Sequence, residues 1–208
     1  MKYVKQLVAS IAIVLLSLQQ IEAKVTMPYF ISDNMVLQQQ AKPLIWGWAS
    51  PNTKITVTTS WNNKKQITES AADGKWSIRL EKGAAGGPYT MNISDGEMLT
   101  LKNILLGEVW LCSGQSNMEM PLKGFRDQPI QGSNEAIMHS NNDQIRLYTV
   151  PRSVQRTPMD TSKMQSWKSA APETVNGFSA TAYYFGKELY SILNVPIGLI
   201  NISYGGSV

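Results

Sequence analysis

The sequence has very little of the two residues from which most metal sites and disulfides are built. It contains one cysteine, Cys112, and one histidine, His139, among 208 residues. A single cysteine cannot form an internal disulfide, and Cys112 lies in an apolar run typical of a strand. His139 has no other histidine or cysteine near it at a spacing that binds a metal. We therefore interpret Cys112 as a buried structural thiol and expect no metal site.

The sequence also lacks a basic cluster and an apolar run long enough to cross a bilayer. Its formal net charge of +4 is spread along the chain, so nucleic acid is not an expected partner. The apolar run 7–18 is shorter than the roughly 20 residues that a bilayer core requires. It follows Lys2 and Lys5 and precedes Ala23, a residue that signal peptidase accepts. We predict a signal peptide over residues 1–23, a secreted or periplasmic mature protein, and no stable membrane insertion.

Residues 24–103 consist of short alternating runs separated by turn residues. In the run 54–61, Ile55, Val57 and Thr59 would share one face of a half-buried strand. Seven runs of this kind at this spacing predict a small immunoglobulin-like (Ig-like) β-sandwich. The expected strands are 34–39, 43–48, 54–61, 64–69, 75–80, 89–94 and 98–102.

The pattern changes in residues 104–208, where apolar strands alternate with helices. Residues 108–112 form a nearly continuous apolar run, the kind of strand that is buried on both faces of a parallel sheet. Strand and helix in alternation predict a doubly wound α/β domain. The other expected elements are the helices 133–140 and 179–193 and the strands 144–150 and 196–203. Residues 151–177 are expected to form irregular surface, with a lid as the alternative.

The last residues predict that the α/β domain is incomplete. Only three parallel strands are expected, and the turn at Gly205 and Gly206 should lead into a further helix. An unfinished parallel sheet exposes an unpaired edge and an uncovered apolar face. We therefore expect the chain to be the N-terminal part of a longer, multi-domain protein.

The stretch GEVWLCSGQSNMEMP, residues 107–121, places a serine directly after the apolar strand. Open α/β sheets bind ligands at the carboxyl ends of their strands, so Ser116 lies where a nucleophile is expected. The alternative is a capping box, in which Ser116 and Glu119 satisfy each other's backbone amides. Pro121 leaves room for little more than one helical turn, which disfavours that alternative. Gln115 either lines a pocket or is a plain turn residue, and both interpretations stay open.

Three stretches of the sequence resemble one known family. GEVWLCSGQSNMEMPL resembles the nucleophile block of the SGNH-hydrolase superfamily, in its sialate O-acetylesterase branch. SDNMVLQQQAKPLIWGWA and DGKWSIRL resemble the N-terminal β-domain of that branch, and FSATAYYFGKELYSILNVPIGLINISYGGS resembles its second conserved block. The resemblance implies a β-sandwich followed by a three-layer SGNH-type α/β hydrolase domain, truncated here. It also implies a serine carboxylic-ester hydrolase that removes O-acetyl groups from sugars or sialic acid without a cofactor.

The resemblance also implies roles for individual residues. Ser116 matches the nucleophile, and Gly205 and Gly206 match the block whose backbone N–H helps to form the oxyanion hole. The family's base is a histidine in a D-x-x-H block near the C-terminus. His139 does not fit that block, because Ala136 stands three residues before it. We therefore expect the catalytic Asp and His beyond residue 208, and we expect this chain to be an inactive fragment.

A second hypothesis is a non-catalytic carbohydrate-binding protein in which the β-sandwich binds the glycan. It is motivated by tryptophan, since Trp46 and Trp48 would lie on one face of an expected strand. Aromatic residues of a sandwich more often pack in its core, so we prefer the esterase. No residue of the mature chain identifies the sugar. Lys123 and Arg126 follow Ser116 closely, and we interpret both as solvated surface charges.

Overall fold

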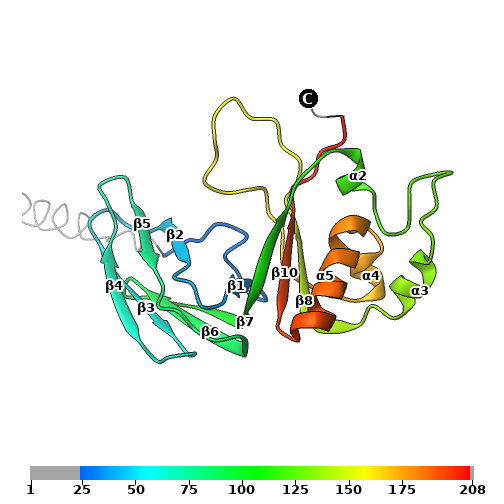
Figure 1. Cartoon of the computed structure of the whole chain (residues 1–208). Coiled ribbons are helices and arrows are strands. Elements are labelled where there is room, and N and C mark those ends of the chain that lie inside the picture. The colour runs from blue at the N-terminus through cyan, green and yellow to red at the C-terminus, as the bar shows by residue number, and fades with distance from the viewer. Residues whose placement is uncertain (1–23, 207–208) are drawn as a thin grey trace, which may run out of the picture.

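A single long strand, β7 (Met98–Cys112), joins a β-rich part of the molecule to an α/β part (Figure 1). The computed structural model describes residues 24–206, so the predicted signal peptide lies outside the described residues. The main sheet has the strand order β4-β3-β6-β7-β10-β8-β9, and β1 also pairs with β7. The two parts therefore share one sheet, and the domain boundary expected at residue 103 falls inside β7.

The strands of the β-rich part are short, and each of the seven expected strands overlaps an observed one. They are β1 Val36–Gln38, β2 Leu44–Trp48, β3 Lys54–Thr59, β4 Lys65–Glu69, β5 Lys75–Arg79 and β6 Gly86–Ser94, together with the first half of β7. β3, β4, β6 and β7 form an antiparallel sheet, whereas β2 and β5 form a separate two-stranded sheet. The predicted Ig-like sandwich is not confirmed, because β7 continues beyond this part and pairs in parallel with β1.

One apolar core lies between these two sheets. Ile45 of β2 and Trp76 of β5 belong to the same buried cluster as Ile55 and Val57 of β3. The predicted alternation along β3 is confirmed, since Ile55 and Val57 are fully buried and Lys54 is exposed. Removing this apolar surface from water is the main force that holds the two-stranded sheet in place.

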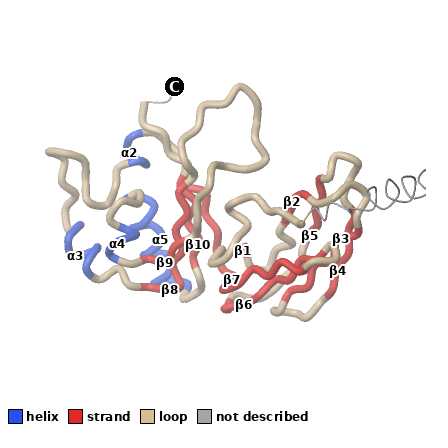
Figure 2. The backbone as a smooth tube through the Cα atoms, turned by 180° about the vertical axis from the view of Figure 1, so that it is seen from behind, coloured by secondary structure: helices blue, strands red, loops and turns tan. Residues whose placement is uncertain are grey.

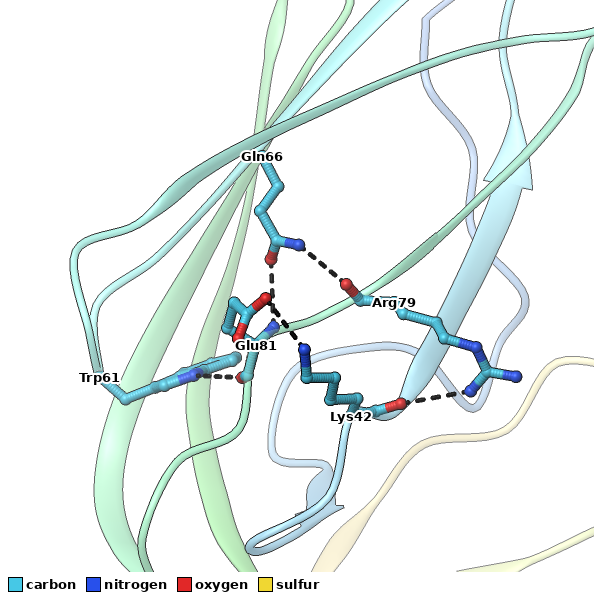
Figure 3. A network of polar contacts seen from close by, with 5 residues as sticks. All are labelled: Lys42, Trp61, Gln66, Arg79 and Glu81. Atoms are coloured by element: carbon cyan, nitrogen blue, oxygen red, sulfur yellow. Dashed lines mark hydrogen bonds and ion pairs between the residues drawn. The ribbon is translucent and has the colours of Figure 1, made fainter.

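Polar side chains connect β4 to β5, which belong to different sheets (Figure 3). The Gln66 amide donates to the carbonyl oxygen of Arg79 at 2.8 Å and accepts from the backbone N–H of Glu81 at 3.2 Å. Trp61 Nε1 donates to the carbonyl oxygen of Glu81 at 3.3 Å, and Lys42 pairs with the Glu81 carboxylate at 3.3 Å. These contacts take the place of a backbone ladder between the two strands.

The α/β part confirms the predicted alternation of strand and helix. Its central strand β10 (Ile197–Asn201) lies between the second half of β7 and β8 (Asn142–Thr149) and is parallel to both. The helices lie on one face of this sheet (Figure 1). They are α2 Ser116–Glu119, α3 Ser133–Met138, α4 Pro172–Val175 and α5 Ala180–Leu193. A doubly wound, three-layer arrangement needs helices on the second face as well, and within residues 24–206 none lies there.

Residues 108–112 are less buried than expected, and this prediction was wrong. Trp110 is 43% exposed and Leu111 is 63% exposed. Among the described strands only β10 pairs with these residues, because β1 ends opposite Gly107. The strand that matches the expected pattern is β10, which has a partner on each side and buries Ile197 and Leu199 completely.

The excursion 151–177 is more ordered than expected. It contains β9 (Lys168–Ala170), which pairs antiparallel with β8, and α4, whose first residue is Pro172. Elements of three and four residues are too short to produce a periodic pattern in the sequence. Residues 151–167, in contrast, form the loop that arches over the second face of the sheet (Figure 2).

Helix α5 covers the first face of the sheet and begins close to its predicted start. The side chain of Ser179 accepts a hydrogen bond from the N–H of Ala182 at 3.1 Å and so caps the helix. Its buried residues Ala182 and Tyr183 belong to the same core as Leu199 of β10. No helix among residues 24–206 is long and apolar enough to span a membrane.

Candidate active site

Ser116 lies immediately after β7, at the carboxyl edge of the parallel strands, as the sequence predicts. It is the first residue of the one-turn helix α2, which Gln115 precedes. The carbonyl oxygen of Ser116 accepts the N–H of Met120 at 2.9 Å. Ser116 and Gln115 are both exposed. Ser116 therefore lies at the surface and is not packed into the interior.

The capping-box interpretation of Ser116 and Glu119 is wrong. The N-cap position belongs to Gln115, and no side chain caps the helix there. The carboxylate of Glu119 accepts the backbone N–H of Gly205 at 2.6 Å. Glu119 therefore contacts a distant segment of the chain, a partner that the spacing S-x-x-E cannot indicate because it concerns only local residues.

The segment that follows β10 runs alongside the segment that follows β7. The N–H of Ile202 donates to the carbonyl oxygen of Cys112 at 2.9 Å, and the N–H of Tyr204 donates to that of Gly114 at 3.0 Å. A β-carbon placed on Gly205 would lie 3.7 Å from the Cα of Ser116. The structure thus brings the diglycine next to the serine, although Gly205 lies 89 positions after Ser116 in the sequence.

The two glycines differ in what their N–H groups contact. The N–H of Gly205 donates to Glu119, so it is not available to a bound substrate. The N–H of Gly206 has no acceptor within residues 24–206. Gly206 has a φ of +78°, a left-handed conformation that residues with a side chain rarely adopt. Between the two, Gly206 is the better candidate for a donor to an oxyanion.

Arg152 is a site residue that the sequence analysis missed. It forms an ion pair with Glu119, and its guanidinium lies 4.8 Å from the ring centre of Tyr204. By contrast, Arg126 has a side chain that is 96% exposed and pairs only with its neighbour Asp127 at 3.6 Å. Arg152 lies three residues after the end of β8, and residues after neighbouring parallel strands gather at one edge of a sheet. From the sequence, only this position after a predicted strand could have indicated that Arg152 lies near Ser116.

The loop 151–167 also contacts the β-rich part. The carbonyl oxygen of Asp160 accepts Trp46 Nε1 at 3.2 Å, and its carboxylate pairs with Lys75 at 2.7 Å. Between this loop and the sheet lies a cavity of about 640 Å³, which Leu111 and Ile200 help to line. The loop therefore has one contact at the candidate site and another on β2 and β5.

The remaining sequence predictions concern His139 and Cys112. His139 follows α3, which lies toward the opposite end of the α/β part from α2 in both views (Figures 1 and 2). Its Nδ1 lies 3.0 Å from the carbonyl oxygen of Glu135, to which it can only donate. Cys112 is 7% exposed and burial raises its pKa, which confirms a buried thiol. Within the described part of the chain, no group of three or more His, Cys, Asp or Glu side chains is arranged to hold a metal.

Comparison with known proteins confirms the family resemblance. No protein-family model matches the chain. The sialate O-acetylesterases of Pongo abelii and Homo sapiens are each 31% identical to it over 195 residues, and that of Mus musculus is 31% identical over 199 residues. Each alignment covers 86% of this chain and 35 to 36% of the relative. The chain therefore spans about a third of the length of these relatives.

A solved structure supports the same relationship. The crystal structure of XAC1771, a carbohydrate acetylesterase from Xanthomonas citri, superimposes with a TM-score of 0.82 and 36% sequence identity. The match covers 89% of this chain and 41% of that one. The mixed sheet with few helices is thus consistent with an SGNH-like acetylesterase fold.

Proposed function

We propose that this chain, a relative of the sialate O-acetylesterases, belongs to a carbohydrate O-acetylesterase in which Ser116 is the nucleophile. The observation that carries the proposal is the position of an exposed serine just past the carboxyl end of β7, with Gly205 beside it. A nucleophile of this kind needs access to substrate and backbone N–H groups close by. The names of the relatives supply the substrate class, an acetylated sugar or sialic acid.

The reaction we propose is two-step acyl transfer. Ser116 Oγ attacks the acetyl carbonyl carbon while its proton passes to a general base, and the C=O electrons move to the oxygen. The N–H groups of Ser116 and Gly206 stabilise that oxyanion. The C–O bond to the sugar then breaks, and the sugar oxygen takes the proton from the base. Water hydrolyses the acetyl-serine in the same way and releases acetate.

The general base in this mechanism is the histidine that the family resemblance implies. His139, the single histidine of the chain, lies away from Ser116 and does not serve. We propose that residues 1–208 alone have little or no esterase activity, because losing a triad member typically costs on the order of 10⁴ in rate. We also propose that the protein is secreted or periplasmic, on the strength of residues 1–23.

The experiment uses the protein encoded by the gene up to its natural stop codon. Release of acetate is measured with O-acetylated sialic acid and with acetylated xylo-oligosaccharides. Ser116→Ala should lower kcat by about 10⁴-fold or more while leaving Tm unchanged. Ser113→Ala, at an exposed serine of the same turn, is the matched control and should keep full activity. Full activity in Ser116→Ala would end the proposal.

A second candidate function is glycan binding by the β-rich part, without catalysis there. It is favoured by a cavity of about 490 Å³ on β2 and β5, which Trp46, Trp48 and Trp76 help to line. Aromatic faces beside polar groups suit the apolar and hydroxyl surfaces of a sugar. Calorimetric titration with xylo-oligosaccharides should then give heat that Trp48→Ala abolishes and Trp61→Ala leaves intact. Equal binding by both variants would exclude this cavity.

A further inference from the structure

We infer that Glu119 and Arg152 are positioning residues: Glu119 fixes the diglycine turn against the Ser116 turn, and Arg152 cancels the Glu119 charge beside the forming oxyanion. This inference rests on the function proposed above. It concerns two residues that do not touch the reacting atoms and act through the backbone of Gly205 and Gly206. Three segments that follow three parallel strands meet at this carboxylate.

Glu119 connects two of these segments directly. Its Oε2 accepts the N–H of Gly205 at 2.6 Å, the short distance of a hydrogen bond to a charged acceptor. Its side chain is only 20% exposed. A β-carbon on Gly205 would collide with the same oxygen, so the carboxylate can approach the N–H this closely only because residue 205 has no side chain. The carboxylate and the diglycine turn therefore fit together as one unit.

Arg152 brings in the third segment. It pairs with Oε1 of Glu119, which leaves Oε2 for Gly205. Its guanidinium also rests on the ring of Tyr204, whose own N–H donates to the carbonyl oxygen of Gly114. The turn that carries Ser116 and the turn that carries the glycines are thus connected twice. Glu119 binds Gly205, and the N–H of Tyr204 binds Gly114.

The charge of this arrangement bears directly on the proposed reaction. An unpaired carboxylate next to the Ser116 turn would repel the negative charge that develops on the acetyl oxygen. Arg152 neutralises that carboxylate, so the turn can use an anionic acceptor without opposing the oxyanion. Because Glu119 occupies the N–H of Gly205, the following N–H, that of Gly206, is the one left for an oxyanion. Glu119 therefore determines which amide is available.

The test separates the hydrogen bond from the charge, using kcat and KM of the natural full-length protein with an O-acetylated sugar. Glu119→Ala removes the acceptor for Gly205 and should lower kcat by about 10²-fold, with KM changed by less than about threefold. Glu119→Gln keeps a neutral acceptor and should stay within about tenfold of the parent. Arg152→Gln leaves the carboxylate unpaired and should lower kcat by at least about tenfold.

The double variant Glu119→Gln with Arg152→Gln decides the charge argument. It removes both charges together, so its kcat should exceed that of Arg152→Gln alone, an effect that simple loss of structure would not produce. Arg156→Gln removes the same charge from the same exposed loop and should leave kcat unchanged.

The variants of Ser116 test the proposed function, whereas those of Glu119 and Arg152 test the positioning roles. Full activity of Ser116→Ala would remove the proposed function. If Ser116→Ala is inactive while Glu119→Ala keeps the parent kcat, the function stands and the positioning role is overturned. Should Glu119→Ala fail to fold, the comparison of Arg152→Gln with the double variant still decides. A kcat in the double variant no higher than that of Arg152→Gln overturns the role of Arg152.

Discussion

The two parts of the molecule share β7 but use their polar side chains in different ways. In the β-rich part, Gln66 and Glu81 connect neighbouring strands, and each has a structural partner on β4, β5 or the segments beside them (Figure 3). In the α/β part, Glu119 connects segments that follow strands and leaves the neighbouring Ser116 exposed. The polar contacts between strands in the β-rich part stabilise the fold. The polar contacts after the strand ends of the α/β part can instead position a reactive side chain.

The largest effect expected in this comparison is on stability, in the core of the β-rich part. Ile55→Ala should lower the free energy of unfolding by about 2 to 5 kcal/mol, because Ile55 is fully buried between the two sheets. Urea denaturation measures the change. Ile67→Ala removes the same atoms from a side chain that is 54% exposed and should cost far less. Equal losses would mean that this core does not hold the sheets together.

The next largest effect is expected on turnover, at the strand ends. Gly205→Ala should lower kcat of the full-length protein by about 10²-fold, because the added methyl group pushes the Glu119 carboxylate away from the N–H of residue 205. Its Tm should change little. Gly177→Ala is the control, since a β-carbon there meets nothing within 4 Å. An unchanged kcat in Gly205→Ala would show that the diglycine turn has no part in the reaction.

The difference between the two parts also explains what the sequence could predict. Periodicity depends on neighbours along the chain, so it identified the alternation of β3 and the helix α5. It divided β7 in two because Lys102 and Asn103 interrupt the apolar pattern. The register of β6 and β7 shifts at these two residues, but the strand itself continues on both sides of them. Ladder pairing is decided by distant strands and leaves no local signal.

The candidate site was predictable only where a motif marks it. Ser116 and the diglycine lie in two recognisable blocks, and the structure brings Gly205 beside Ser116. For Glu119 the sequence offered only a local partner, in the capping box that Pro121 disfavours, whereas its hydrogen bond reaches Gly205. Arg152 belongs to no motif, and its position after β8 predicts the edge of the sheet on which it lies but not its contact with Glu119.

A smaller effect is expected at Cys112, where β7 ends below the candidate site. Burial raises the pKa of this thiol, so less thiolate forms at neutral pH in the folded protein than in the unfolded one. Iodoacetamide should label the folded protein at least about tenfold more slowly at pH 8 than the protein in urea. Because the thiol of the folded protein keeps its proton to a higher pH than that of the unfolded protein, the free energy of unfolding should fall as pH rises above the ordinary thiol pKa. Equal labelling rates would contradict the burial of Cys112.

The smallest effect is expected where the loop 151–167 contacts the β-rich part. Lys75 and Asp160 form an ion pair at 2.7 Å, but both side chains are more than half exposed, and exposed pairs contribute little. Lys75→Gln should therefore leave Tm unchanged within error. It should also leave kcat unchanged, because Lys75 lies on β5 in the β-rich part. Arg152, at the other end of the same loop, is as exposed as Lys75, yet its removal should lower kcat. If Lys75→Gln lowered kcat as much as Arg152→Gln does, the role of each charge would not depend on the residue with which it pairs.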